Sequence, residues 1–305
     1  MTSQRTVQIL LSTYNGEPYL GELLESLAHQ SYRPIALLAR DDGSSDETPR
    51  ILSDYRSLES KEIVAGEHLG VIRSFFDLLR RSSESASFFA FCDQDDIWGR
   101  DKLARAIQLL DDLRKPGPAM YCGRTKYVDK ALRSLSLSKT PRRGPSFRNA
   151  LVENIATGCT IVINKPARDL LLEHIPAKAQ MHDAWFYLVL TACGSVVFDN
   201  EPFILYRQHG MNVVGVETRL GRRWLLRLRR FLARSRRPLS EQAAEFLASY
   251  GAAVPDENAR IAREFLAGTT GDWSRRLLYA LQCGVWRQSA LDSLLVRVFI
   301  VLGRV

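Results

Sequence analysis

The first half of the chain alternates short apolar runs with segments that carry apolar residues at helical spacing. This alternation constrains the fold more than any other feature, because strands that alternate with helices form a mainly parallel sheet covered by helices on both faces. Apolar runs predict strands at residues 7–12, 35–40 and 88–92, and residues 61–65 are a weaker strand candidate. Helical spacing predicts helices at residues 17–29, 70–80 and 102–113.

Polar clusters follow three of these predicted strands. They are Thr13–Asn15, the pair Asp41-Asp42 and the run Asp93–Asp96. In sheets of this kind, ligands bind outside the carboxyl ends of the strands. We therefore expect three clusters from distant parts of the sequence to converge on one edge of an α/β sheet.

The run Asp93–Asp96 (DQDD) is the most informative local signal. Carboxylates at the tip of a buried strand are costly unless something neutralises them. A divalent cation that also binds diphosphate oxygens would do so. The alternative is that these residues, Asp96 in particular, cap the helix predicted at 102–113. A D-x-D pattern does not by itself decide between the two.

The other acidic and imidazole candidates are equally ambiguous when taken singly. Asp42 could accept a hydrogen bond from the ring N–H of a pyrimidine, or Asp41-Asp42 could serve only a turn and a helix cap. Asp183 begins a predicted helix at 183–191, where an acid is commonly a cap. His209 could be a hydrogen-bonded surface histidine.

Six segments stand in a fixed order across residues 5–215: LLSTYNGEPYLGELLESLAHQSY, LARDDGSSDET, GEHLGVIRSFFDLL, FCDQDDIWGRDKL, MHDAWFYLVL and ILYRQHGMNVVG. In this order they resemble the GT-A-fold glycosyltransferases called family 2. CDQDDIW and LYRQHGMNVVG are most similar to the bacterial branch of rhamnosyltransferases in surface polysaccharide assembly. The resemblance implies a GT-A (Rossmann-like) fold and inverting transfer from a nucleotide-diphosphate sugar.

The resemblance also implies roles for individual residues. It implies Asp183 as the general base, and a Mn²⁺ or Mg²⁺ ion held by Asp95 with Asp93 and His209. It implies nucleotide-sugar binding by the following residues: Ser12, Thr13, Tyr14, Asn15, Asp41, Asp42, Gly70, Arg73, Asp93 and Gln94. Two positions depart from the family pattern. Arg40 stands where an apolar strand residue is common, and His182 stands where Glu is commoner.

The implied reaction moves a sugar from a dTDP- or UDP-sugar to a hydroxyl of a saccharide or lipid-linked acceptor. Rhamnose rests only on the branch resemblance. Uracil and thymine present the same ring N–H, so the two donors stay open, as do the acceptor, the linkage and the oligomeric state. A nucleotidyltransferase is the alternative enzyme, but it would need a Gly-rich basic loop that STYNGEPY lacks. Intact Asp42, Asp95 and Asp183 argue against an inactive binding subunit.

We place a domain boundary near residue 215, with a catalytic domain at 1–215 and a basic helical region at 216–305. The net charge is +8, and residues 219–237 hold nine arginines and no acid. Apolar residues at helical spacing among these arginines favour a helix lying on an anionic bilayer. Residues 286–305 form a second apolar segment. The alternatives are a helical subdomain with solvated arginines and a nucleic-acid-binding segment, but no recognition motif supports the latter.

The expected location is cytoplasmic, with peripheral contact at the inner face of the plasma membrane. Residues 1–5 lead straight into an apolar strand, so the sequence shows no signal peptide. It also has no uncharged apolar stretch of about 18 residues, the length that a spanning helix needs. The five cysteines form no C-x-x-C pair and are expected to be buried free thiols.

Overall fold

The computed structural model describes residues 5–58, 60–209 and 238–305. The strands of this part are β1 (Val7–Thr13), β2 (Ile35–Asp41), β3 (Lys61–Ala65), β4 (Phe88–Asp93), β5 (Ile97–Trp98), β6 (Ala119–Val128), β7 (Ser134–Leu137), β8 (Val162–Asn164) and β9 (Ser195–Arg207). The helices are α1 (Glu17–Ala28), α2 (Thr48–Asp54), α3 (Val71–Arg81), α4 (Lys102–Asp111), α5 (Phe147–Ala150), the 3-10 turn η1 (Gly158–Thr160), α6 (Lys165–Leu172), α7 (His182–Cys193), α9 (Pro238–Tyr250), α10 (Asp256–Thr270), α11 (Trp273–Gln282) and α12 (Ala290–Val301).

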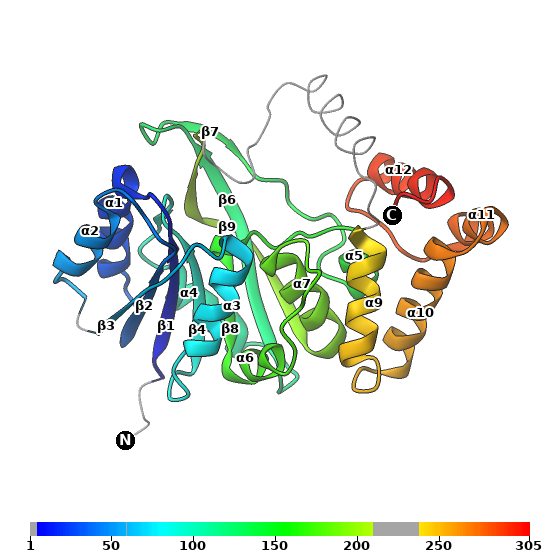
Figure 1. Cartoon of the computed structure of the whole chain (residues 1–305), viewed down its shortest axis with the longest axis horizontal. Coiled ribbons are helices and arrows are strands. Elements are labelled where there is room, and N and C mark those ends of the chain that lie inside the picture. The colour runs from blue at the N-terminus through cyan, green and yellow to red at the C-terminus, as the bar shows by residue number, and fades with distance from the viewer. Residues whose placement is uncertain (1–4, 59, 210–237) are drawn as a thin grey trace.

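The described strands form one mixed sheet in the order β3-β2-β1-β4-β8-β6-β9-β5, with β7 paired to β6 (Figure 1). The predicted half is parallel: β1 pairs with β2 and β4, and β2 pairs with β3. The second half adds antiparallel pairs, because β8 runs against β4 and β6. A short turn joins β6 to β7, and such a connection can only link antiparallel strands.

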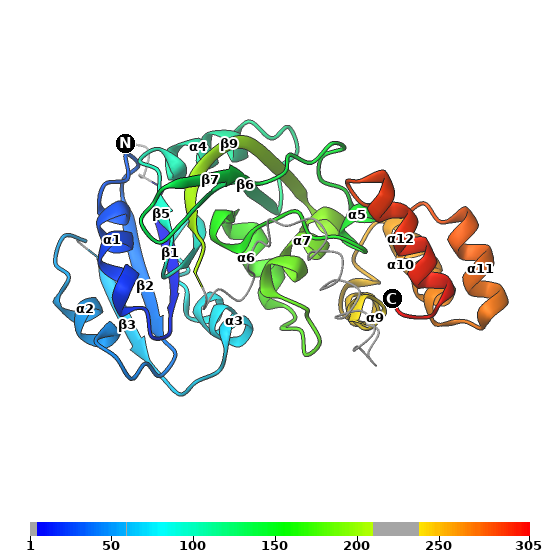
Figure 2. The same cartoon turned by 90° about the horizontal axis from the view of Figure 1, so that it is seen from above.

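Helices cover both faces of the sheet, as the sequence predicts (Figure 2). Alternate residues of a strand point to opposite faces. Accordingly, Ile9 and Leu11 of β1 pack in a core with α1 and α4, whereas Leu10 packs in a second core with α3 and α7. The expected α/β architecture is therefore confirmed, and it leaves the carboxyl ends of β1, β2 and β4 at one edge.

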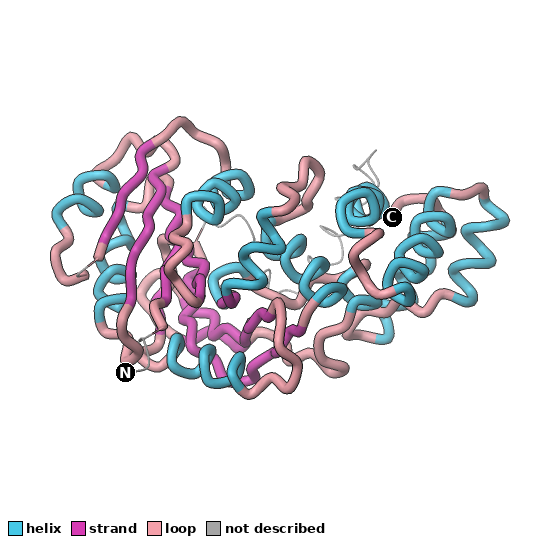
Figure 3. Tube along the Cα trace, turned by 90° about the horizontal axis from the view of Figure 1, so that it is seen from below, coloured by secondary structure: helices cyan, strands magenta, loops and turns pink. Residues whose placement is uncertain are grey.

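The C-terminal helices α9–α12 continue the second core (Figure 3). Phe246, Phe265 and Ile300 from these helices are buried in the same cluster as Trp185 of α7. The proposed boundary near residue 215 and the arginine-rich segment 219–237 lie outside the described residues. Among the helices that are described, none combines the length and the apolar character needed to cross a membrane.

Gly194 allows a close backbone contact between the end of α7 and the start of β6. A Cβ atom built at this residue would lie only 2.2 Å from the carbonyl oxygen of Pro118. That oxygen accepts a hydrogen bond from the N–H of Ser195 at 2.9 Å, which fixes it in place. A residue with a Cβ atom therefore does not fit at position 194 unless the backbone shifts.

We expect Gly194→Ala to lower the free energy of unfolding by about 1–3 kcal/mol, since the backbone must shift to admit the methyl group. Gly21→Ala is the matched control, because a Cβ at Gly21 in α1 would meet nothing within 4 Å. That change should leave stability equal or raised by up to about 1 kcal/mol. Urea denaturation measures both, and equal stability of the two variants would contradict the packing argument.

Candidate active site

Strand register brings the three predicted polar clusters together. Thr13 at the end of β1 lies opposite Asp41 of β2, and Ser12 lies opposite Asp93 of β4. Because all three strands are parallel, their carboxyl ends meet at the same edge of the sheet. The convergence expected from the sequence is therefore present, and it forms the floor of the candidate site.

The loops that follow β1, β2 and β4 are tied to one another. The N–H of Tyr14 donates to Gln94 Oε1 at 2.7 Å, and Gln94 Nε2 donates back to the carbonyl of Tyr14 at 2.8 Å. A Cβ at Gly16 would lie 2.3 Å from the same Gln94 oxygen, so a larger residue here would displace the Gln94 side chain. The N–H of Asn15 donates to Ser44 Oγ at 2.8 Å.

Asp41 is buried at the end of β2, and it holds the turn that follows. Its Oδ1 accepts hydrogen bonds from Thr13 Oγ1 at 3.1 Å and from Ser44 Oγ at 2.6 Å. Its Oδ2 accepts one from the N–H of Ser44 at 2.9 Å. This carboxylate therefore links the ends of β1 and β2.

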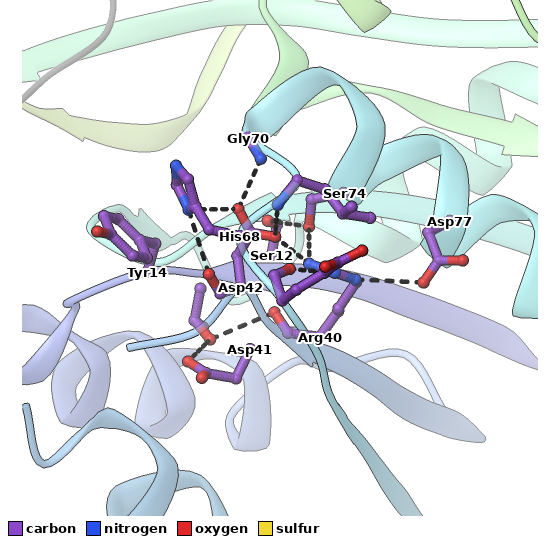
Figure 4. A network of polar contacts seen from close by, with 12 residues as sticks. Ser12, Tyr14, Arg40, Asp41, Asp42, His68, Gly70, Ser74 and Asp77 are labelled. Carbon is purple, nitrogen blue, oxygen red and sulfur yellow. Dashed lines mark hydrogen bonds and ion pairs between the residues drawn. The ribbon is translucent and has the colours of Figure 1, made fainter. Parts of the chain in front are cut away.

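Asp42 is also buried, and its carboxylate is surrounded by donors (Figure 4). Oδ1 accepts the N–H of Leu69, and Oδ2 accepts the N–H of Gly70, both at 2.8 Å. Arg40 forms an ion pair with Oδ1, and His68 Nδ1 lies 3.0 Å from Oδ2. These contacts engage both oxygens and hold the loop before α3 against the end of β2.

Arg40, the departure from the family pattern, is a buried cation shared between two carboxylates. Besides Asp42 it contacts Asp77 Oδ2 at 3.2 Å, and it donates to the carbonyl of Glu67 at 2.9 Å. A Cβ at Gly66 would lie 2.9 Å from its guanidinium, so the loop passes closely over it. Arg40 thus joins β2, the loop before α3 and α3 itself.

An exposed aromatic pair borders the same edge. The rings of Tyr14 and His68 lie 4.3 Å apart between centroids with a 40° tilt. Tyr14 is 45% exposed, and the side chain of His68 is 57% exposed. Gly70, with a φ of 78°, caps α3, and Arg73 is exposed in its first turn. His68 was not singled out by the sequence patterns, since its role depends on a contact across the fold.

The residues from DQDD meet the end of β9. His209 Nε2 lies 2.7 Å from Asp95 Oδ2, and the His209 ring stacks on Tyr19 at 4.8 Å. The buried Arg207 donates from Nε to the carbonyl of Asp95 at 3.0 Å and from its N–H to Asp96 Oδ1 at 3.3 Å. The sequence patterns named His209 as a site residue, but they did not indicate that Arg207 supports the acidic loop.

Burial leaves this acidic group short of positive charge. Burial, reinforced by the charges of Asp95 and then Asp183, raises the pKa of Asp93 to about 7. Burial and the charges of Asp95 and Asp93 raise the pKa of Asp96 well above its usual range. Within the described chain, Asp96 Oδ2 has no hydrogen-bond partner. The N-cap of α4 is Asp101, so the alternative of Asp96 as helix cap is wrong.

A buried lysine lies under the acidic loop. Lys102 Nζ is 3.0 Å from the centre of the Trp98 ring and has no hydrogen-bond partner among the described residues. Burial lowers the pKa of Lys102 to about 7, so it supplies only part of the missing charge. Burial also raises the pKa of the nearby Cys159 thiol well above its usual range, which keeps it neutral.

The acidic loop fits a hard divalent cation. The ligand atoms that the described chain brings within 4.8 Å of one another are those of Asp93, Asp96 and Cys159. Of the predicted set, Asp93 and Asp95 add carboxylates and His209, at the end of β9, an imidazole, and these donor types suit Mn²⁺ or Mg²⁺. The unpartnered oxygen of Asp96 and the raised pKa values show that added positive charge would be stabilising here.

Asp183 lies in the first turn of α7, and its charge contributes to the raised pKa of Asp93. Its Oδ2 accepts the N–H of Gly158 at 3.1 Å, and its Oδ1 accepts the N–H of Ala184 at 2.7 Å. Burial raises the pKa of Asp183 to about 6, partly offset by these bonds and one from Asn154. A carboxylate with this pKa is ionised at neutral pH and can accept a proton.

The side chain of His182, the residue before Asp183, is buried in apolar surroundings. Its ring is 4.1 Å from the ring of Phe75 and also contacts Phe91 and Phe186. Neither ring nitrogen has a hydrogen-bond partner within the described residues. Burial lowers the pKa of His182 to about 3, so the imidazole is neutral.

Comparison with known proteins identifies the family. Residues 8–175 of the 305-residue chain match the family model described as Glycosyl transferase family 2. The dTDP-rhamnosyl transferase RfbG of Shigella flexneri is 29% identical over 224 residues, which cover 67% of this chain and 73% of that protein. The uncharacterized glycosyltransferase RP339 of Rickettsia prowazekii is 24% identical over 208 residues, covering 67% of this chain and 64% of that protein.

Another relative, the uncharacterized protein Rv1520 of Mycobacterium tuberculosis, is 27% identical over 213 residues. These cover 68% of this chain but only 60% of that protein. The chain thus spans less than two thirds of the length of some relatives that it matches. The resemblance seen in the sequence is nevertheless confirmed by the family match.

Solved structures share the fold. The S. aureus TarS 1-349 complex with UDP has a TM-score of 0.60 and 15% identity, covering 98% of this chain and 88% of that one. The mannosyltransferase PcManGT of Pyrobaculum calidifontis, in complex with GDP-Man and Mn²⁺, has a TM-score of 0.56 and 19% identity, covering 99% and 86%. Both are GT-A glycosyltransferases, so the expected GT-A fold is confirmed.

The Arg40 network yields a stability prediction. Arg40→Met should lower the free energy of unfolding by about 3–5 kcal/mol, because Asp42 would lose its buried cation. Arg81→Met is the matched control, since Arg81 contacts the same Asp77 oxygen at 2.9 Å but is 50% exposed. That change should cost less than about 1 kcal/mol. Guanidinium denaturation measures both, and a similar loss in the two variants would refute the distinction.

Proposed function

This chain belongs to glycosyl transferase family 2 and is a glycosyltransferase, and we propose that it is inverting and metal-dependent. The proposed reaction moves a sugar from a dTDP- or UDP-sugar to a hydroxyl of a saccharide or lipid-linked acceptor in surface polysaccharide synthesis. The observation that carries the proposal is the meeting of three strand-end clusters at one edge of the sheet, where the charge of the half-buried Asp183 also acts on Asp93. Rhamnose is the proposed sugar because the Shigella relative bears the name of a dTDP-rhamnosyl transferase.

We propose Asp183 as the general base. The acceptor hydroxyl attacks the anomeric carbon, and Asp183 takes its proton while the bond from that carbon to the diphosphate oxygen breaks. Attack from the side opposite the leaving group inverts the anomeric centre. The N–H groups of Gly158 and Ala184 fix the carboxylate and stabilise its charged form.

We propose that Asp95, with Asp93 and His209, holds the Mn²⁺ or Mg²⁺ ion. When bound, that ion supplies positive charge to the leaving nucleoside diphosphate, so no protein acid is required. Arg207 supports the arrangement because it fixes the backbone of Asp95 and lies 4.8 Å from the centre of the Tyr19 ring, on which His209 also stacks.

The nucleotide is proposed to bind along the tied loops. Ser12, Thr13, Tyr14, Asn15, Gly70, Arg73 and Gln94 border this edge. The geometry favours Asp41 over Asp42 for the pyrimidine ring N–H, because both oxygens of Asp42 already hold Arg40, His68 and the loop before α3. Among the described residues, Asp41 Oδ2 accepts a single hydrogen bond, from the N–H of Ser44. We therefore propose Asp41 as the base-recognising acid and Asp42 as the residue that positions the loop.

The proposed location is cytoplasmic, at the inner face of the plasma membrane, where a lipid-linked acceptor would be found. The sequence-based argument for this rests on the basic segment 219–237, which lies outside the described residues. A nucleotidyltransferase or a nucleic-acid-binding protein is not proposed, since the family match covers the acidic motifs Asp41-Asp42 and Asp93–Asp96.

Asp183→Asn should lower kcat by at least about 100-fold, the usual contribution of a general base, while leaving the Kd of the donor nucleotide unchanged. Because the pKa of Asp183 is about 6, wild-type kcat should fall as the pH drops below that value, where the carboxylate becomes protonated. A coupled assay for nucleotide release measures the rate, and isothermal titration measures donor binding. Near-wild-type kcat in the variant would refute the assignment.

A thermal-shift screen tests the donor and metal sites together. UDP or dTDP should raise Tm by about 5 °C at saturation, and only when Mn²⁺ or Mg²⁺ is present. Asp95→Asn should abolish the metal-dependent part of this shift, whereas Asp183→Asn should retain it. If folded protein shows no shift with any nucleoside diphosphate, the proposed donor site is wrong.

A further inference from the structure

Exposed apolar side chains gather at the C-terminal end of the molecule. Of the ten large hydrophobic side chains that are exposed in the described chain, seven lie on α11, α12 or the residue after it. They are Trp273, Leu278, Leu281, Leu291, Leu294, Val298 and Leu302, and we call them the terminal apolar surface. In Figure 1 these helices lie at the opposite end of the molecule from β1–β3.

Helix α12 presents apolar residues to solvent along a continuous stripe. Leu291, Leu294, Val298 and Leu302 follow one another at spacings of three and four, so they share one helix face. They are 54%, 58%, 44% and 57% exposed, respectively. A helix at the surface of a water-soluble protein normally exposes charged or polar residues to solvent. This stripe therefore has the character of a face that contacts another apolar phase.

The opposite face of α12 is already used by the protein core. Val296 is 3% exposed, and Ile300 is fully buried in the cluster that includes Trp185 of α7. The exposed stripe is thus not a core face left open by loose packing. Helix α11 adds Leu278 and Leu281, which are 56% and 69% exposed.

The charge around the terminal apolar surface indicates its partner. Residues 273–305 contain five arginines and a single acidic residue, Asp292. A surface that combines apolar side chains with arginines suits the boundary between anionic headgroups and acyl chains. A second copy of the chain would instead bring two positively charged segments together, which is unfavourable.

We propose that the terminal apolar surface docks on an anionic lipid bilayer, with the α12 stripe entering the acyl-chain boundary and the exposed Arg275 contacting lipid phosphates. This inference deepens the membrane contact in the proposed function and rests on it only for the lipid-linked acceptor. It locates that contact on described residues, independently of the segment 219–237.

Vesicle co-sedimentation of the full chain tests the proposal. The protein should sediment with phosphatidylcholine vesicles that contain about one third phosphatidylglycerol, should not sediment with pure phosphatidylcholine, and should be released by salt. Leu294→Glu with Val298→Glu should weaken binding by at least tenfold. The matched control is Leu135→Glu with Leu137→Glu, which makes the same change at two exposed leucines of β7 and should bind like the wild type.

Arg275→Glu offers a second test that keeps the apolar stripe and should weaken binding to the anionic vesicles alone. Circular dichroism confirms that each variant is folded.

Equal binding by wild type and the α12 double variant would overturn the proposal, as would equal binding to neutral vesicles. A dimer that dissociates in the double variant, seen by light scattering without vesicle binding, would assign the surface to a second copy. None of these results would alter the nucleotide-dependent thermal shift, so failure here is distinct from failure of the proposed reaction.

Discussion

The parallel register of β1 with β2 and β4 is the constraint on which the site depends. It places Asp41 opposite Thr13 and Asp93 opposite Ser12, so carboxylates from distant sequence positions share one buried edge. Buried negative charge must be compensated. Asp42 is compensated within the protein by Arg40 and two backbone N–H groups. The negative charge around Asp93 is not compensated in this way, and the pKa of Asp93 is raised as a result.

The edge of the sheet therefore has two parts. The part around Asp42 is held by contacts within the protein, and the part around Asp93 would be stabilised by an added cation. On the fixed side, Arg40 joins β2 to α3 and to the loop between them, so the loops that we propose to bind the nucleotide are held in place by the protein itself. On the other side, Asp95 and His209 meet at 2.7 Å, but Lys102 beneath them is only partly charged. A cation bound with the diphosphate would complete the balance, which couples donor binding to metal binding.

Local patterns predicted the parallel half of the fold well, because each strand there is a continuous apolar run followed by an amphipathic helix. They did not predict the antiparallel pairing of β8, a strand of three residues whose partners lie far away in the sequence. The same limit applies to the site. Asp41, Asp42 and Asp93 were found from their position after strands, whereas the roles of His68 and Arg207 arise from contacts across 26 and 112 residues.

The substitution of His182 for the commoner glutamate has a consistent electrostatic consequence. A second carboxylate beside Asp183 would add like charge to a site where Asp93, Asp95 and Asp183 already repel one another. The buried imidazole stays neutral, since burial lowers its pKa to about 3, and it packs among Phe75, Phe91 and Phe186. Position 182 therefore adds no charge beside Asp183. The pKa of Asp183 is about 6, so this carboxylate is ionised at neutral pH and could accept a proton, as the proposed role of general base requires.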